Sequence, residues 1–186
     1  MATYVGIDQA LNKIGVCVLL DGVSVSLHLI KTPRNLRGTE RLTFLRNQLE
    51  AQLVSYRGNI THAALEAQSL GSLGDIDQLG QINGVVQIVL ADLGIAHPLL
   101  VPPATLKKFV TGHGSASKAR MMQATTKYWD VTIEQDDLCD AHGLARVAEE
   151  VHEQRSRVRH QIEATLSLTR PRKKRPRRKS TNDSTL

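Results

Sequence analysis

The sequence predicts an α/β protein whose mixed five-stranded sheet is flanked by helices. Strand-like segments alternate with segments of helical period along most of the chain, which is the pattern of a sheet covered by helices. The first three strand-like segments follow one another directly. Asp21-Gly22 joins the second to the third, and this dipeptide is typical of a two-residue hairpin. We therefore expect the sheet to begin with three adjacent antiparallel strands.

The individual elements follow from periodicity and from turn residues. Leucines at 42, 45, 49 and 53 recur at helical spacing, and Pro102-Pro103 closes the last strand-like run. The expected strands are short apolar runs at 3–7, 14–20, 23–30, 60–66 and 96–101. The expected helices lie at 38–55, 78–93, 104–110, 116–128 and 137–153.

Composition excludes several classes of protein. With 41% hydrophobic residues in 186, the chain can bury a core, so disorder throughout is excluded. No apolar run is long enough for a membrane span, and the N-terminus lacks the pattern of a secretory signal. Two cysteines, Cys17 and Cys139, make no disulfide framework. These features fit a reducing cytoplasm.

The positive charge is concentrated at the C-terminus. Residues 170–186 hold eight Lys or Arg and one acid, whereas residues 1–169 hold 16 basic and 17 acidic residues. We expect a folded domain at 1–155 and a basic, largely disordered tail at 156–186 that meets a polyanion. A merely solubilising tail and a targeting signal are the other interpretations of this charge.

Four carboxylates stand out by position. Asp8 ends the first strand, Glu66 ends the fourth, and Asp137 and Asp140 share one face of the last helix. If the two strands are neighbours, all four meet at one edge of the sheet, where their repulsion calls for cations. Oxygen ligands favour Mg²⁺ or Mn²⁺, and two such ions would form a phosphodiesterase site.

Each acid also has a simpler interpretation. Asp137 and Asp140 would suit a helix N-terminus, where negative charge is favoured, and Asp8 would suit an Asx turn. Glu66 is harder to explain in this way, because it ends an apolar strand. Asp136 is a further candidate ligand. Spacing alone leaves the metal site and the helix cap both open.

Five segments of the chain resemble the RuvC-type Holliday junction resolvases. They are residues 6–10 (GIDQA), 65–66 (LE), 79–85 (LGQINGV), 107–118 (KKFVTGHGSASK) and 137–141 (DLCDA). They occur in the family's order and spacing. The resemblance implies an RNase H-like fold, a homodimer, and Mg²⁺- or Mn²⁺-dependent cutting of four-way DNA junctions in recombination and repair.

The resemblance also assigns roles to individual residues. It makes Asp8, Glu66, Asp137 and Asp140 the catalytic carboxylates that bind metal. It places Lys107 and Lys118 near the scissile phosphate and the DNA backbone, a role that phosphate-dominated affinity supports. The expected DNA-binding set is Lys107, Lys108, Lys118, Ser69, Leu70, Arg172, Lys173, Lys174 and Arg175. In this family the helix at 78–93 lines the dimer interface. Gly80 and Gly84 suit that role, or tight packing on the sheet.

The chain departs from the family pattern in three places. Gln9-Ala10 replace the usual Pro-Gly, and the loop at 69–74 carries no aromatic wedge, which leaves Leu70 or Leu73 for that purpose. The basic tail is an addition that fits a phage or viral member. A nuclease for flaps, forks or RNA, and a binding protein without catalysis, stay open as alternatives. The intact set of four acids argues against the second.

Overall fold

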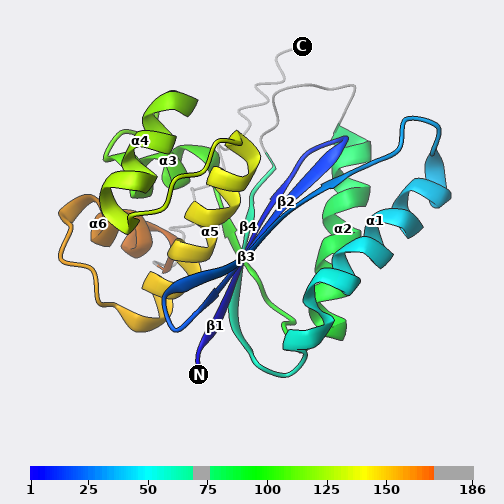
Figure 1. Cartoon of the computed structure of the whole chain (residues 1–186), viewed down its shortest axis with the longest axis horizontal. Helices are drawn as coiled ribbons and strands as arrows, with labels where there is room; N and C mark the ends of the chain where they lie inside the picture. The colour runs from blue at the N-terminus through cyan, green and yellow to red at the C-terminus, as the bar shows by residue number, and fades with distance from the viewer. Residues whose placement is uncertain (69–75, 170–186) are drawn as a thin grey trace, which may run out of the picture.

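The computed structural model describes residues 1–68 and 76–169, and the expected mixed sheet is present there (Figure 1). Its strand order is β3-β2-β1-β4-β5. The first three strands are antiparallel neighbours, whereas β1 pairs with β4, and β4 with β5, in parallel. The strands are β1 (Thr3–Gln9), β2 (Lys13–Leu20), β3 (Val23–Lys31), β4 (Ile60–Glu66) and β5 (Leu99–Val101).

Asp21 and Gly22 form the predicted hairpin turn. Both have positive φ, 48° and 80°, which is the conformation that favours this dipeptide between two strands. The Asp21 amide also donates a hydrogen bond of 2.9 Å to the carbonyl of Ala2. The turn therefore fixes the register of β2 and β3 and holds them beside the start of β1.

Helices cover both faces of the sheet (Figure 1). α1 and α2 pack on one face through leucine, isoleucine and valine side chains, and α5 packs on the other face with α3, α4 and α6 around it. Two separate aliphatic cores result. The helices are α1 (Gly38–Leu53), the 3₁₀ turn η1 (Val54–Tyr56), α2 (Ile76–Asp92), α3 (Pro103–Thr111), α4 (Lys118–Trp129), α5 (Asp136–Glu153) and α6 (Arg159–Thr169).

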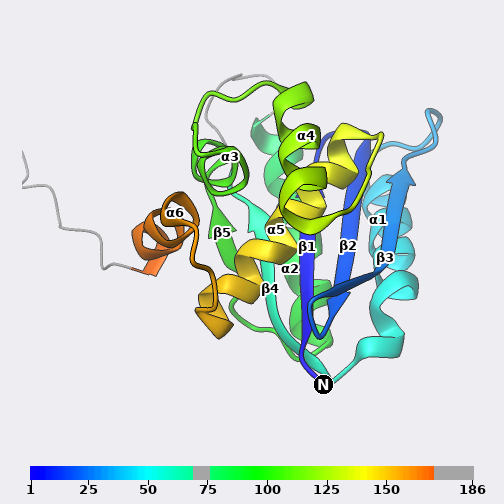
Figure 2. The ribbon, with the colours of Figure 1, turned by 60° about the vertical axis from the view of Figure 1, so that its left-hand side comes forward.

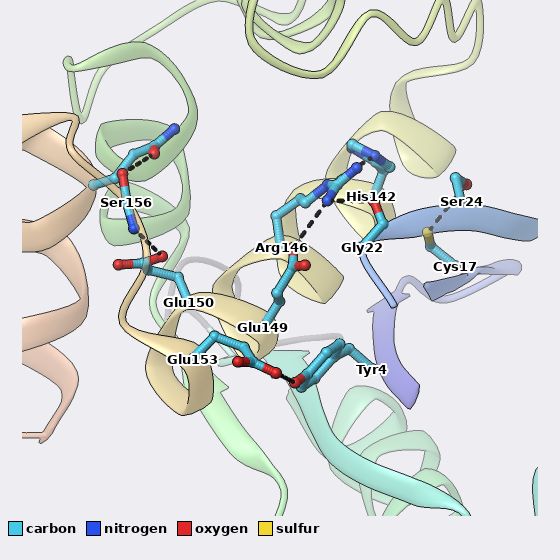
Figure 3. Close-up of polar contacts among 11 residues, drawn as sticks. Tyr4, Cys17, Gly22, Ser24, His142, Arg146, Glu149, Glu150, Glu153 and Ser156 are labelled. Carbon is cyan, nitrogen blue, oxygen red and sulfur yellow. Dashed lines mark hydrogen bonds and ion pairs between the residues drawn. The ribbon is translucent and has the colours of Figure 1, made fainter. Parts of the chain in front are cut away.

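Polar contacts anchor the C-terminal half of α5 to the sheet (Figure 3). Arg146 is 8% exposed and donates hydrogen bonds of 2.9 Å to the carbonyl of Gly22 and to Glu149. The Tyr4 hydroxyl donates to Glu153 Oε1 at 2.5 Å. These contacts lie at the edge of the sheet where β1 begins, so they fix the direction in which the N-terminal half of α5 runs.

α6 lies inside the segment that the sequence assigns to the tail. It packs against α3 (Figure 2) and buries Gln161, Ala164 and Thr165. Because these inward residues are polar or small, no apolar period marks the helix in the sequence. Helical structure therefore reaches Thr169, whereas the sequence argument places the end of the domain at residue 155. The remaining tail, 170–186, lies outside the described residues.

No helix in the described ranges has the length and apolar character needed to cross a bilayer. α1 ends at Leu53, two residues short of its expected end, and α2 begins at Ile76, two residues before its expected start. β5 is reduced to Leu99–Val101 from the expected 96–101. None of these shifts moves an acidic candidate, since Glu66 still ends β4 and Asp137 lies in the first turn of α5, which begins one residue earlier than expected at Asp136.

Candidate active site

Two acids lie side by side where neighbouring parallel strands end. Ile7 of β1 is paired with Leu65 of β4, so the next residues along each strand, Asp8 and Glu66, are adjacent. Asp8 is only 7% exposed. This adjacency is the condition on which the sequence argument for a shared site depended, and the topology meets it.

Glycines allow α5 to approach this edge of the sheet closely. A Cβ on Gly6 would overlap backbone atoms of Ala141 and Ala145, and one on Gly15 would lie 2.5 Å from the carbonyl oxygen of Asp137. The helix therefore rests on the backbones of β1 and β2 without intervening side chains. This contact brings Asp137 and Asp140 down toward Asp8, which is paired with Gly15 across the sheet.

The electrostatics show that the acids share one environment. Burial, then the charges of Glu66 and Asp140, raise the pKa of Asp8 to about 9, and Asp137 adds to this rise. Burial also raises the pKa of Asp140 to about 6, with Glu66 and Asp136 contributing. The pKa of Glu66 is raised by burial, against a hydrogen bond from Asp8. The pKa values of all three acids are therefore raised by one shared, buried and negatively charged environment.

Three lysines offset the remaining negative charge. Lys13 is paired with Asp137, and Lys118 is paired with Asp136, whose pKa falls mainly through that hydrogen bond. Lys107 opposes the rise in the pKa of both Glu66 and Asp140. The lysines come from β2, α4 and α3, so the acids are flanked by positive charge on both sides.

The remaining predicted DNA-binding residues do not join this cluster. The Lys108 ammonium lies 2.9 Å from Glu163 of α6, and both side chains are exposed. Ser69, Leu70 and residues 172–175 lie outside the described residues. The structure therefore separates Lys107 from Lys108, although they are adjacent in sequence.

Lys13 was missed by sequence reasoning, although a signal was available. It begins β2 directly after a short turn from β1, and Gln9 is paired with Ile14 across that turn. The start of β2 must therefore lie at the same edge as Asp8. A basic residue at that position is a candidate neighbour for any acid there.

The donor set fits a hard divalent cation, because it consists of carboxylate oxygens from three elements. Within the described ranges, however, no three His, Cys, Asp or Glu side chains are arranged to hold one metal ion. Lys13 engages Asp137 and Lys118 engages Asp136, and burial beside Glu66 raises the pKa of Asp8. Cation binding would replace these counter-charges.

Comparison with solved structures shows the class of protein to be one with the α/β RNase H-like fold. A structure of Thermus thermophilus RuvC in complex with Holliday junction substrate matches 77% of this chain and 90% of that chain, with a TM-score of 0.67 and 20% identity. A further Thermus thermophilus RuvC structure gives a TM-score of 0.66 at the same coverage. The predicted fold class is confirmed.

Curated sequences identify the relatives more closely. The crossover junction endodeoxyribonuclease RuvC of Mycobacterium avium is 24% identical, over 89% of this chain and 98% of that protein. The Brachyspira hyodysenteriae RuvC is 28% identical, over 72% of this chain and 80% of that protein. No protein-family model matches the chain. The chain is a distant relative of the RuvC-type crossover junction resolvases, which confirms the resemblance seen in its motifs.

Proposed function

We propose that the protein is a Mg²⁺- or Mn²⁺-dependent endonuclease that resolves four-way DNA junctions by paired nicks. The observation that carries this proposal is the convergence of Asp8, Glu66 and Asp140 from three separate elements at one sheet edge. A buried cluster of like charges is costly unless it binds cations. The relationship to RuvC-type resolvases supports branched DNA as the substrate.

Each residue of the cluster has a role in this proposal. Asp8, Glu66, Asp137 and Asp140 hold the cations, with Asp137 exchanging its contact with Lys13 for a metal. Two bound divalent ions would supply an activated water and a counter-charge for the leaving oxygen. Lys107 and Lys118, which flank the acids, bind phosphate oxygens and position the strand.

The outer face of α2 supports a homodimer. Gly80 and Gly84 are exposed, and a Cβ on either would meet no atom of the described residues within 4 Å, so neither glycine serves packing on the sheet. Ile88, one turn further along, is 57% exposed. A two-fold dimer through this face would present two sites to a symmetric junction.

Substrate choice tests the proposal. Purified protein would be incubated with a synthetic four-way junction, a flap, a fork and a linear duplex of matched sequence, with and without Mg²⁺. We expect Mg²⁺-dependent, symmetric nicking of the junction at a rate well above that of the linear duplex. Faster cleavage of the flap or fork would reassign the substrate, and binding without cleavage in Mg²⁺ and Mn²⁺ would refute an enzyme.

A further inference from the structure

A cavity of about 150 Å³ lies where the loop between β3 and α1 meets the first turn of α2. Among the residues that the structure describes, its wall contains three arginines, three neutral polar residues and no acidic residue. The polar residues that matter here are Asn12, Thr32, Arg34, Arg37, Arg41 and Gln78. This concentration of positive charge suits an anionic ligand.

The hydrogen bonds inside the cavity are incomplete. Arg41 donates from Nη1 to Gln78 Oε1 at 2.8 Å, but its Nε and Nη2 atoms are buried and have no partner in the described part of the chain. The Thr32 hydroxyl is likewise buried and unpartnered. Buried donors without acceptors are unfavourable. An acceptor placed in the cavity would satisfy them.

The charges are also uncompensated. None of Arg34, Arg37 and Arg41 forms an ion pair with a described residue, whereas Arg46, further along α1, pairs with Asp92 and Glu50. Arg37 instead donates to the backbone carbonyls of Arg34 and Leu36, at 2.6 and 2.8 Å, within its own short loop. Several arginines converging on one space are typical of phosphate recognition, because the planar guanidinium matches phosphate oxygens.

The cavity lies at the same edge of the sheet as the acid cluster. Thr32 follows β3 and donates from its backbone amide to the carbonyl of Asn12 at 2.9 Å. The next residue, Lys13, is paired with Asp137 of the acid cluster. The arginines thus lie on the β3 and α1 side of the acids, and Lys107 and Lys118 lie on the α3 and α4 side.

We propose that this arginine cavity binds a backbone phosphate of the DNA strand that crosses the acid cluster, a few nucleotides from the scissile bond. The inference rests on the proposed function, because it takes the bound polymer to be the substrate. It adds a second contact point, on the opposite side of the acids from the lysines. A strand held on both sides has a defined direction through the site.

The test compares a cavity variant with a matched control. Arg34→Gln combined with Arg37→Gln removes two charges but leaves Arg41 and its contact with Gln78 in place. The Arg37 side chain makes no capping hydrogen bond to α1, so the helix start is preserved. Arg46→Gln removes a charge from the same helix outside the cavity. Thermal unfolding verifies that all three proteins are folded.

Binding to a fluorescent four-way junction would be measured across a salt series without divalent cation. We expect the affinity of the double variant for the junction to fall by up to about tenfold. The slope of its log affinity against log salt should be smaller by about 1–2. Arg46→Gln should leave both unchanged. Equal losses in the control, or an unchanged slope in the double variant, would overturn the proposal.

A second measurement identifies the occupant. Single methylphosphonate linkages, which lack the negative charge, would be scanned along the strand that is cut. One neutral linkage near the scissile bond should weaken junction binding by wild type and leave binding by the double variant unaffected. Inorganic phosphate would also be tested for its effect on the Tm of wild type. If it raises that Tm but every linkage affects the two proteins equally, the cavity takes free phosphate and the inference is wrong.

The two proposals can fail independently. Cleavage by wild type together with unaltered binding by the double variant would refute the arginine site alone. Arginine-dependent binding without cleavage by wild type would leave the site standing and refute the nuclease.

Discussion

Gly15→Ala tests whether the contact between α5 and the sheet positions the acids. The new Cβ would lie 2.5 Å from the carbonyl oxygen of Asp137 and 3.0 Å from its carbonyl carbon. To restore an ordinary contact of 3.4 Å to that oxygen, the start of α5 must retreat by about 0.9 Å. Asp137 would move with it, away from Asp8, because Asp8 is the strand partner of Gly15.

Both stability and activity should respond to this retreat. Overpacking of a core contact costs about 1–3 kcal/mol, which lowers Tm by roughly 2–12 °C for a chain of this length. A displacement of about 1 Å in a catalytic group reduces the rate roughly 100-fold. Junction cleavage would be measured well below the Tm of the variant, with circular dichroism to show that it is folded.

Gly80→Ala is the matched control for thermal unfolding. Gly80 lies on the exposed face of α2, where a Cβ meets no atom of the described residues within 4 Å, so alanine should raise the stability of the monomer by about 0.5–1 kcal/mol. Opposite signs for the two substitutions would support the account. A Gly15→Ala protein with wild-type Tm and wild-type cleavage would refute the idea that the glycine contact sets the position of the acids.

Three further predictions follow from the same features. The pKa of Asp8 is raised from 3.8 to about 9, so the stability that its bound proton supplies is complete below pH 4 and declines as the pH rises toward 9. Asp8→Asn should remove this decline and therefore have a higher Tm than wild type at pH 8 without metal. Equal Tm values at pH 8 would contradict this prediction. Gly84→Arg should convert a dimer to a monomer in sedimentation while circular dichroism shows that the protein stays folded, since a Cβ at this position meets no atom of the described residues within 4 Å. A persistent dimer would exclude the α2 face. Deletion of residues 170–186, which carry eight basic residues, should weaken binding to the junction and to linear duplex alike, and should lower the slope of log affinity against log salt by about 3–4. Cleavage at saturating DNA should stay unchanged. An unchanged slope would show that the tail makes no phosphate contacts.

Most of the fold could be predicted from the sequence, because its local patterns agreed with one another. Asp21-Gly22 predicted a hairpin that is present, and the leucine spacing of 38–55 predicted α1. α6 was missed for a physical reason, since its buried residues include Gln161 and Thr165 and give no apolar stripe. A helix whose buried residues are polar and hydrogen-bonded has no periodic pattern of apolar residues, so hydrophobic periodicity does not predict it.

The candidate site was predictable only in part. Strand ends identified Asp8 and Glu66, and helical spacing placed Asp137 and Asp140 on one face. Pair partners such as Lys13 with Asp137, or Lys108 with Glu163, join residues more than 50 positions apart, so they depend on the tertiary fold. The outward direction of Gly80 and Gly84 likewise became clear only once the face of α2 on the sheet was known.

The central claim is that the buried acids form a metal-dependent cleavage site separate from the groups that bind DNA. The most direct measurement is single-turnover cleavage of a saturating four-way junction in Mg²⁺ by wild type, Asp8→Asn and Glu66→Gln, with binding measured alongside. Asp77→Asn, which changes an exposed acid in the first turn of α2, is the matched control. We expect the first two variants to bind the junction at least as tightly as wild type and to lose cleavage, while Asp77→Asn retains both. Near-normal cleavage by either Asp8→Asn or Glu66→Gln would contradict the account.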